Sequence, residues 1–427
     1  MDAPSGASFL FGVPSMQSER TDWTGPVSKA EFVAVMALLM ALNALAIDIM
    51  LPGMSQIGAA LGVADENTRQ YVITAYLLGF GVMQILFGPL SDRFGRKLPL
   101  LAGISVYVAG AFAAAFAPDF ETLLFFRLIQ GAGAAATRVL TIAMVRDVAG
   151  GRAMAEIMSL VMMVFMAMPV VAPALGQAIL LAFNWHWIFV FMAAGGLGAM
   201  AWMGLRIPET LAPENRRSFS ATVIAEGFRA VLTNRLSLWY TLATASIFAA
   251  LFGFINTAQQ IYVGIYGLGN MFPLVFAGVA GTMSVFSFLN ARIVHRYGMR
   301  RVSHAALLVF IAASSLIWVL SLSGTVPLAL FLALFTIAMC AFGMMTPNFA
   351  AIAMEPLGRM AGVASSVQGF MQTVAGALLG AAIGQTFDGT VTPVMASFAL
   401  VSAASLVFVL VAEKGRLFTN PGAHHAV

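Results

Sequence analysis

Three charged side chains lie inside long apolar stretches of the sequence, where they could bind a proton or a charged solute. Asp48 lies in the apolar run 31–54, and Arg127 and Arg138 lie in the run 122–145. A charge at the centre of a membrane-spanning helix costs about 2.5–3.5 kcal/mol on insertion scales, so each of the three requires an explanation. The second half of the chain has no comparable charge well inside an apolar run.

Asp48 and Arg127 are predicted to lie at similar depth. Asp48 comes about 16 residues, or about 24 Å of helix, after its run begins, and Arg127 lies about one turn inside a run that starts from the other side. One interpretation is a structural ion pair between two helices. The other is a proton-coupling pair, because desolvation favours a neutral carboxyl group and a nearby cation favours the ionised form. The distance between the two groups decides the balance.

Arg138 lies about three turns beyond Arg127 in the same run. Its guanidinium group binds a substrate, bonds to backbone carbonyl groups, or extends toward the membrane surface, and the sequence leaves these alternatives open. Polar amides and pliable apolar side chains in other runs are further candidates to line a cavity. The candidate residues of a substrate cavity are Asn43, Arg138, Phe252 and Asn256.

The stretch 88–97 (GPLSDRFGRK) marks an abrupt exit from an apolar run, because its acid and three bases cannot lie in hydrocarbon. Gly95 permits the tight reversal that a short loop between two helices requires. A similar stretch, 295–301 (HRYGMRR), places Gly298 at an offset of 203 residues from Gly95 in a chain of 427. A loop repeated near the half-length point predicts two structural repeats, which is a common plan for transporters.

The composition indicates an integral membrane protein. Hydrophobic residues make up 60% of the chain and charged residues 9%, against about 25% charged residues in soluble domains. The net charge of +4 does not indicate a nucleic-acid partner, because the bases lie in short loops between apolar runs. The single cysteine, Cys340, excludes an intrachain disulfide and a cysteine metal cluster. The first 29 residues lack the pattern of a signal peptide and are predicted to be a cytosolic tail.

Twelve apolar runs of roughly 17–25 residues predict an all-α fold with twelve transmembrane helices in two six-helix bundles. The predicted spans are 31–54, 71–91, 98–117, 122–145, 156–182, 187–206, 237–258, 271–291, 302–322, 327–346, 362–386 and 391–411. The predicted parts are a tail (1–29), an N-terminal bundle (30–206), a cytosolic linker (207–236), a C-terminal bundle (237–411) and a second tail (412–427).

The linker is expected to contain a short amphipathic helix that begins at Ser220, with Ile224, Phe228 and Val231 on one face. The distribution of bases predicts the orientation of the whole chain. Of 22 Lys and Arg residues, two lie within a span and one, Arg69, lies in the loops of one side, which leaves nineteen on the side that holds both termini. The positive-inside rule therefore predicts cytoplasmic termini.

Several of these stretches resemble the major facilitator superfamily, and specifically its twelve-span drug:proton antiporters. The stretch 88–97 matches the family's first cytosolic-loop motif in full, and 124–133 (LFFRLIQGAG) resembles its fourth-span motif. The stretches 48–52 (DIMLP), 146–147 (RD) and 185–189 (WHWIF) resemble the bicyclomycin/chloramphenicol-resistance branch, although His186 stands where arginine is usual. The resemblance covers about 30–411. The antiporter motif of the fifth span departs from the family pattern at Ala172 and Gln177, which leaves the direction of transport open.

The resemblance implies transport by alternating access, in which two bundles rock about a central cavity. It implies that Asp48 takes the proton and that Arg127 communicates with this site. It also implies that Asp92 holds the cytosolic face closed in one state, helped by the positive N-terminal end of the eleventh span. The residues of this expected gate are Gly88, Asp92, Arg93, Gly95, Arg96 and Asp147.

The expected function is proton-coupled export of small apolar or cationic compounds across a bacterial inner membrane. The alternative is a carrier for one defined metabolite. An enzyme is not indicated, because paired acids or histidines at a membrane face are missing from the sequence, and no ring of like charges indicates a channel. The expected partners are a small-molecule substrate, protons and the lipid bilayer. The protein is expected to be a monomer and to use the proton gradient without a cofactor or metal.

Overall fold

The computed structural model describes residues 27–216 and 220–418, and every regular element in these ranges is helical. Twelve helices are long and apolar enough to cross a membrane, which confirms the predicted number of spans. The helices of the first half are α1 (Lys29–Asp48), α2 (Met54–Ala60), α3 (Glu66–Arg69), α4 (Tyr71–Phe94), α5 (Lys97–Ala114), α6 (Phe120–Val148), α7 (Gly151–Ala182) and α8 (His186–Arg206). The later helices are α9 (Ala221–Thr233), α10 (Arg235–Gln259), α11 (Phe272–Tyr297), α12 (Met299–Ser321), α13 (Leu328–Met354), α14 (Ala361–Gln385) and α15 (Thr392–Ala412).

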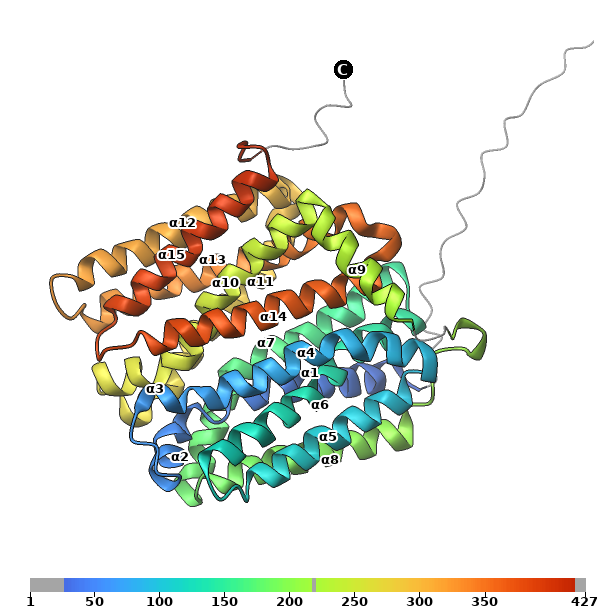
Figure 1. Cartoon of the computed structure of the whole chain (residues 1–427), viewed down its shortest axis with the longest axis horizontal. Helices are drawn as coiled ribbons and strands as arrows, with labels where there is room; N and C mark the ends of the chain where they lie inside the picture. Colours follow the sequence, from blue (N-terminus) through green and yellow to red (C-terminus); the bar gives the residue numbers. More distant parts are fainter. Residues whose placement is uncertain (1–26, 217–219, 419–427) are drawn as a thin grey trace, which may run out of the picture.

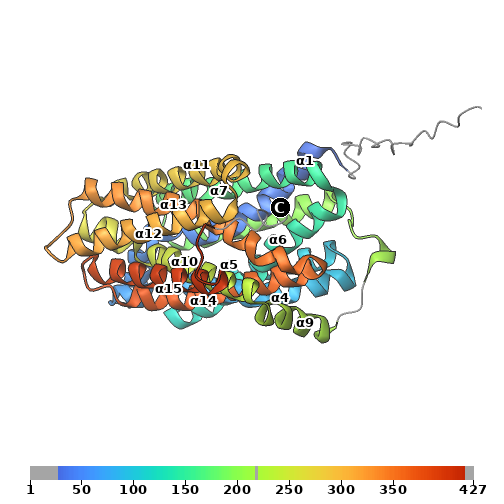
Figure 2. The same ribbon diagram turned by 90° about the horizontal axis from the view of Figure 1, so that it is seen from above.

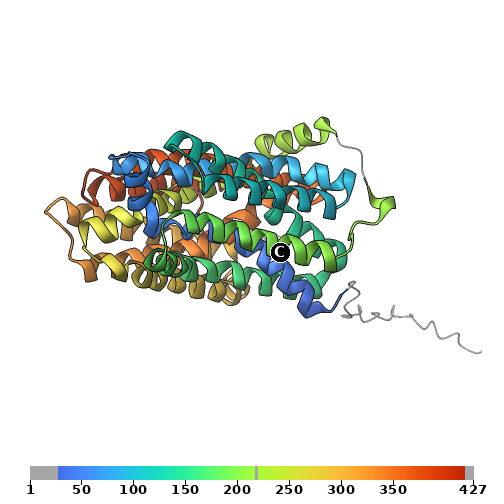
Figure 3. The same cartoon turned by 90° about the horizontal axis from the view of Figure 1, so that it is seen from below.

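The spans form two six-helix bundles that lie side by side (Figure 1). The first bundle contains α1 and α4–α8, and the second contains α10–α15. Two helix pairs join the bundles, α4 with α14 and α7 with α11, and Figures 2 and 3 show this arrangement from opposite sides. We call the end of the molecule where α1 begins and α15 ends the termini face, and the opposite end the far face.

The two similar loops found in the sequence have the same backbone conformation. Gly95 ends α4 with φ 90° and ψ 169°, and Gly298 ends α11 with φ 82° and ψ 153°. Both glycines thus occupy a region of positive φ that other residues rarely adopt. The loop that is repeated in the sequence therefore also repeats its backbone conformation.

Glycines let the helices of each bundle approach closely. A Cβ atom at Gly79 would overlap the carbonyl oxygen of Leu128, and one at Gly131 would overlap that of Tyr76. Close backbone approach of this kind is typical of helix packing in membranes, where van der Waals contact replaces the hydrophobic effect between helices. Since α4 and α6 have no room for even a methyl group at these points, the pair is expected to move as one unit.

The linker helix α9 forms as the sequence predicts and packs on α14. Val231 is fully buried, and the ring of Phe228 lies 5.8 Å from that of Phe370, centre to centre. Ser220 occupies the N-cap position, but its side chain makes no capping hydrogen bond to the backbone. The linker is therefore attached through apolar contacts to a helix of the interface between the bundles.

Candidate functional site

Arg127 is fully buried in α6 and connects three helices of the first bundle. Its guanidinium group donates to the carbonyl oxygen of Ala46 at 3.0 Å, to that of Val72 at 3.2 Å and to Gln130 Oε1 at 2.6 Å. Ala46 lies in the last turn of α1, where carbonyl groups lack a partner within the helix and carry a partial negative charge. Arg127 therefore caps the end of α1 and neutralises part of this charge.

Asp48 is the last residue of α1, and its side chain does not bond to Arg127. The residue is 3% exposed, and its Oδ1 atom has no hydrogen-bond partner among the described residues. No ion pair within 4.0 Å joins Asp48 to Arg127 or to any other described base. The expected pair is thus not formed in this conformation, because backbone carbonyl groups and Gln130 occupy the guanidinium donors.

Tyr76 extends this cluster toward the middle of α1. The centre of the Arg127 guanidinium lies 4.5 Å from the ring centroid of Tyr76, within the range of a cation–π interaction. The hydroxyl group of Tyr76 donates to Asn43 Oδ1 at 2.8 Å. Asn43, expected from the sequence to line a cavity, is therefore connected to Arg127 through one aromatic ring. Tyr76 was missed in the sequence because a tyrosine in an apolar run carries no signal of its own.

Arg138 and the two candidates on α10 differ in their surroundings. Arg138 is half-buried, and the centre of its guanidinium lies 5.9 Å from the ring centroid of Phe80, with no ion pair or hydrogen bond to a described residue. Asn256 is 5% exposed, and neither the nitrogen nor the oxygen of its side-chain amide has a hydrogen-bond partner in the described part of the chain. Phe252 differs from both and packs against α14. A Cβ atom added at Gly380 of α14 would lie 2.7 Å from the Cβ atom of Phe252.

Three of the expected gate residues, Asp92, Arg96 and Asp147, form a compact charge cluster at the termini face. Arg96, 3% exposed, donates to Asp92 Oδ1 at 2.6 Å, to Asp147 Oδ2 at 2.8 Å and to Ser91 Oγ at 2.7 Å. Charge-assisted hydrogen bonds of this length are among the strong ones in proteins. Arg93 lies outside the cluster, is exposed and stacks over Phe94 at 5.1 Å. The cluster therefore joins α4 to the end of α6.

Gly88 marks the place where the second bundle approaches this cluster. A Cβ atom at Gly88 would lie 3.5 Å from Ser366 Oγ on α14. The carboxylate of Asp92 accepts one hydrogen bond, which is also its ion pair, from Arg96, and it makes no such bond to α14 among the described residues. The contact between Asp92 and the start of α14 that the resemblance implies is thus not formed in this conformation.

Glu209, three residues after the end of α8, is a further member of the cluster, for which no role was predicted. Its carboxylate accepts from the backbone N–H groups of Arg96 at 2.7 Å and Lys97 at 3.1 Å, and also from those of Thr210 and Leu211. Burial of this carboxyl group raises its pKa, but the four N–H donors outweigh that effect, and the net pKa of Glu209 is lowered. The carboxylate thereby caps the N-terminus of α5.

Replacing Glu209 by glutamine is expected to destabilise the protein by about 1–2 kcal/mol at neutral pH, because a charged acceptor is lost from a helix N-terminus. Because the pKa is lowered on folding, the stabilisation is present above the unfolded-state value of about 4.3 and disappears as the pH falls through the folded-state pKa. Thermal unfolding in detergent measures this loss of stability. The control is Glu214→Gln, a change at an exposed acid in the same loop. Equal midpoints for the two variants at neutral pH would contradict the capping role.

The second bundle has a corresponding cluster around Arg300. This residue, 7% exposed, donates to Glu355 Oε2 at 2.9 Å and to Glu413 Oε1 at 2.7 Å. Tyr240 also donates to Glu413 Oε1, at 2.9 Å, and contacts His304. Glu413 follows α15, the last helix of the second bundle, as Glu209 follows α8, the last helix of the first. An acid just after the last helix of each half was therefore the sequence signal that could have predicted both clusters.

Uncharged side chains close the far face between the bundles. Gln70 on the first bundle donates to Gln260 Oε1 at 2.7 Å, and Gln260 donates to Asn67 Oδ1 at 2.8 Å. The side chain of Asn67 also donates to the backbone carbonyl oxygen of Phe387 at 2.8 Å. In the opposite direction, the side chain of Gln385 donates to the backbone carbonyl oxygen of Asn67 at 2.8 Å. We call these four residues, Asn67, Gln70, Gln260 and Gln385, the amide latch. It was not foreseen, because single amides near span ends are common.

Comparisons with known proteins agree with this geometry. The family model described as the Major Facilitator Superfamily matches residues 36–381. The chain is 31% identical to a bicyclomycin resistance protein homolog of Haemophilus influenzae, over 85% of this chain and 91% of that protein. It is 35% identical to a chloramphenicol resistance protein of Pseudomonas aeruginosa, over 46% of each. The xylose transporter of E. coli, solved in a partially occluded inward-open conformation, has a similar fold with a TM-score of 0.68, 13% identity and coverage of 90% of this chain and 97% of that one.

Proposed function

Since the chain belongs to the Major Facilitator Superfamily, we propose that it is a proton-coupled antiporter that exports small apolar or cationic compounds. The observation that carries the proposal is Asp48, the one buried carboxyl group in the described part of a chain that is similar to drug-resistance proteins. The buried Arg127 lies on α6, which packs against the helix of Asp48. An intramembrane ionisable residue is by default a candidate for a proton or ion pathway.

The proposed proton cycle depends on the finding that Asp48 Oδ1 has no hydrogen-bond partner among the residues that the structure describes. An ionised carboxylate without a partner is costly in an apolar interior, so we infer that Asp48 carries its proton in this conformation. Rocking of the bundles would bring Asp48 into contact with water or a cationic substrate, which favours release of the proton. Binding of proton and of substrate would therefore exclude each other, as an antiporter requires.

The proposed substrate cavity lies between the bundles and includes Asn256 and Arg138. The free amide of Asn256 offers both a donor and an acceptor, and Arg138 offers a cation without a partner in the described chain. A few polar groups of this kind orient a ligand in an otherwise apolar cavity. A carrier for one metabolite would be expected to use more of them for recognition.

A growth-inhibition screen over unrelated antibacterial compounds, including bicyclomycin and chloramphenicol, tests the proposed function. Expression in a host that lacks its main exporters is expected to raise resistance to several compounds of different structure. Asp48→Asn, made in the same plasmid, is the matched control and is expected to remove the resistance. Protection against one structural class alone would favour a carrier for a defined metabolite.

We also propose that the protein lies in the bacterial inner membrane with its termini face in the cytoplasm. The excess of bases at that face supports this orientation. In a variant whose only native cysteine, Cys340, is replaced by serine, cysteines introduced at the exposed positions Ser323 and Asp388 are expected to react with an impermeant maleimide added to intact cells.

Cysteines at the exposed positions Asn215 and Arg416 are the counterparts at the termini face. They are expected to react only after the membrane is permeabilised. If Asp388→Cys reacts only after permeabilisation, the proposed orientation is wrong. Labelling of all four positions in intact cells would indicate a leaky membrane. A cytoplasmic protein with an exposed cysteine, labelled in parallel, shows whether the membrane was intact.

A further inference from the structure

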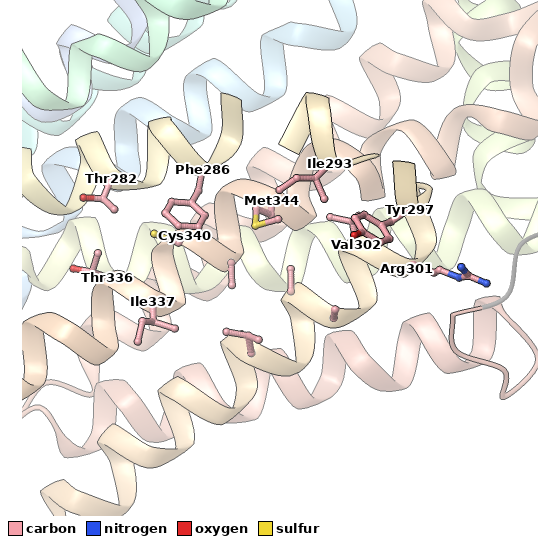
Figure 4. A pocket seen from close by; sticks show the side chains of 14 residues that line it. Thr282, Phe286, Ile293, Tyr297, Arg301, Val302, Thr336, Ile337, Cys340 and Met344 are labelled. Atoms are coloured by element: carbon pink, nitrogen blue, oxygen red, sulfur yellow. The ribbon is translucent and has the colours of Figure 1, made fainter. Parts of the chain in front are cut away.

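An apolar groove runs along the outer side of the second bundle and plays no part in the proposed transport cycle. Its volume is about 600 Å³, and it lies between α11 and α12 with α13 behind them (Figure 4). Because α11 and α12 pack mainly on α13 and little on each other, their facing sides stay open. The groove is lined by side chains such as Phe286, Ile293, Val309, Ile337, Cys340 and Met344.

The groove extends from the termini face to the middle of the membrane. Along α11 its lining runs from Tyr297 to Thr282, which is about 22 Å at 1.5 Å per residue. One leaflet of a bilayer has about 15 Å of hydrocarbon, half of the full core. The groove is therefore long enough for one lipid acyl chain together with the linkage to its headgroup. Val309 and Ile337 are 45% and 48% exposed, so a lipid can enter from the side.

Basic side chains gather at the end of the groove that meets the termini face. Arg301 lies at this end, where Figure 4 shows its guanidinium pointing away from the apolar lining. Arg292 and Arg296 lie nearby on the last turns of α11, are exposed and stack over aromatic neighbours. None of the three forms an ion pair with an acid of the described ranges, 27–216 and 220–418. Positive charge above an apolar slot matches the two parts of an anionic phospholipid.

We propose that this groove binds one anionic phospholipid of the leaflet at the termini face, with an acyl chain along α11–α13 and the phosphate on Arg301. Tyr297, which is 49% exposed, lies beside Arg301 and offers a hydroxyl donor to the same phosphate. The lipid would bridge the facing sides of α11 and α12. This site lies outside the proton-coupling residues and the gate cluster, and its existence does not depend on the proposed function.

Lipid retention by the full-length protein tests the proposal. The protein is delipidated in detergent, incubated with phosphatidylglycerol or phosphatidylcholine, and examined by native mass spectrometry. One phosphatidylglycerol is expected to be retained in preference to phosphatidylcholine. Loss of the charge in Arg301→Gln is expected to reduce this retention about fivefold, whereas Arg301→Lys keeps most of it.

A filled groove provides a second arm. Ala305 is exposed and lines the groove, so Ala305→Trp is expected to displace the lipid; Ala312, exposed two turns further along α12 and outside the groove, gives the matched control Ala312→Trp. Cys340, the only cysteine, reports occupancy in the wild type, since bound phosphatidylglycerol is expected to slow its reaction with an apolar maleimide.

Three results would overturn the proposal. Equal retention of the two lipids would remove the headgroup site, and equal loss in both tryptophan variants would indicate general annular lipid. A reaction rate of Cys340 that does not change with either lipid would show that the acyl chain lies elsewhere. The arginine variants keep the test decisive if Ala305→Trp fails to fold, because Arg301 is an exposed side chain.

Discussion

Replacing Asp48 by asparagine is expected to reduce uphill export driven by a pH gradient to the background level, while substrate binding persists. An amide has nearly the shape of the carboxyl group but has no proton that titrates near neutral pH, so the proton gradient loses its point of entry. The side chain is buried and makes no hydrogen bond through Oδ1, so the variant is expected to fold. Transport into inverted vesicles, with substrate binding measured in parallel, gives the two readouts.

The control is Asp388→Asn, the same change at an exposed acid of the far face. It is expected to transport as the wild type does. Unchanged gradient-driven export by Asp48→Asn would refute the assignment and direct attention to Glu31. Glu31 is the weaker candidate, because its carboxylate is held by Arg206 at 2.7 Å near the termini face. Loss of both transport and binding would indicate a structural role for Asp48.

Replacing Asp92 by asparagine is expected to lower transport severely while the protein still inserts into the membrane. In the present conformation the carboxylate bonds to Arg96 of its own bundle and to no other residue that the structure describes, although α14 passes close by at Gly88. We propose that in the other state Asp92 turns to the N-terminus of α14, where its negative charge is stabilised. A neutral amide would weaken the contacts of both states.

Transport by Asp92→Asn is compared with that of Glu226→Gln, an exposed acid on α9. Each variant is quantified in the membrane before its activity is measured. Full activity of Asp92→Asn would exclude a gating role. If the Asp92→Asn protein is missing from the membrane, Asp92 has a role in folding instead. That role would rest on its bond to Arg96, which also donates to Asp147. Asp92→Glu keeps the charge and is expected to retain part of the activity.

The features that the sequence predicted are those encoded locally. The number of spans follows from apolar runs of membrane length, and the turn at Gly95 and its repeat at Gly298 follow from a glycine beside clustered charges. The linker helix follows from helical periodicity, which places Phe228 and Val231 on one face. In each case neighbouring residues contain the whole signal.

The contacts that the sequence did not predict join distant segments or involve the backbone. Arg127 was expected to face an acid, but two of its partners are carbonyl oxygens, which every residue possesses and no motif can mark. Glu355 directly follows α13 and Glu413 directly follows α15; both meet at Arg300, and no short spacing connects them. The proposed proton site could thus be located by its single acid, but the bonds around it required the fold.

The amide latch lets the far face stay shut under changing external conditions. Counting the latch and its neighbours in the described ranges, eight hydrogen bonds join the bundles at the far face, and none of them involves an ionisable side chain. Ionic strength screens pairs of charges but leaves bonds between neutral groups almost unchanged, and no acid or base in these bonds titrates. Opening exchanges each bond for one with water at a net cost of about 0.5–1.5 kcal/mol. The seal is therefore weak enough to break in every cycle and yet indifferent to the salt and acidity of the surrounding medium.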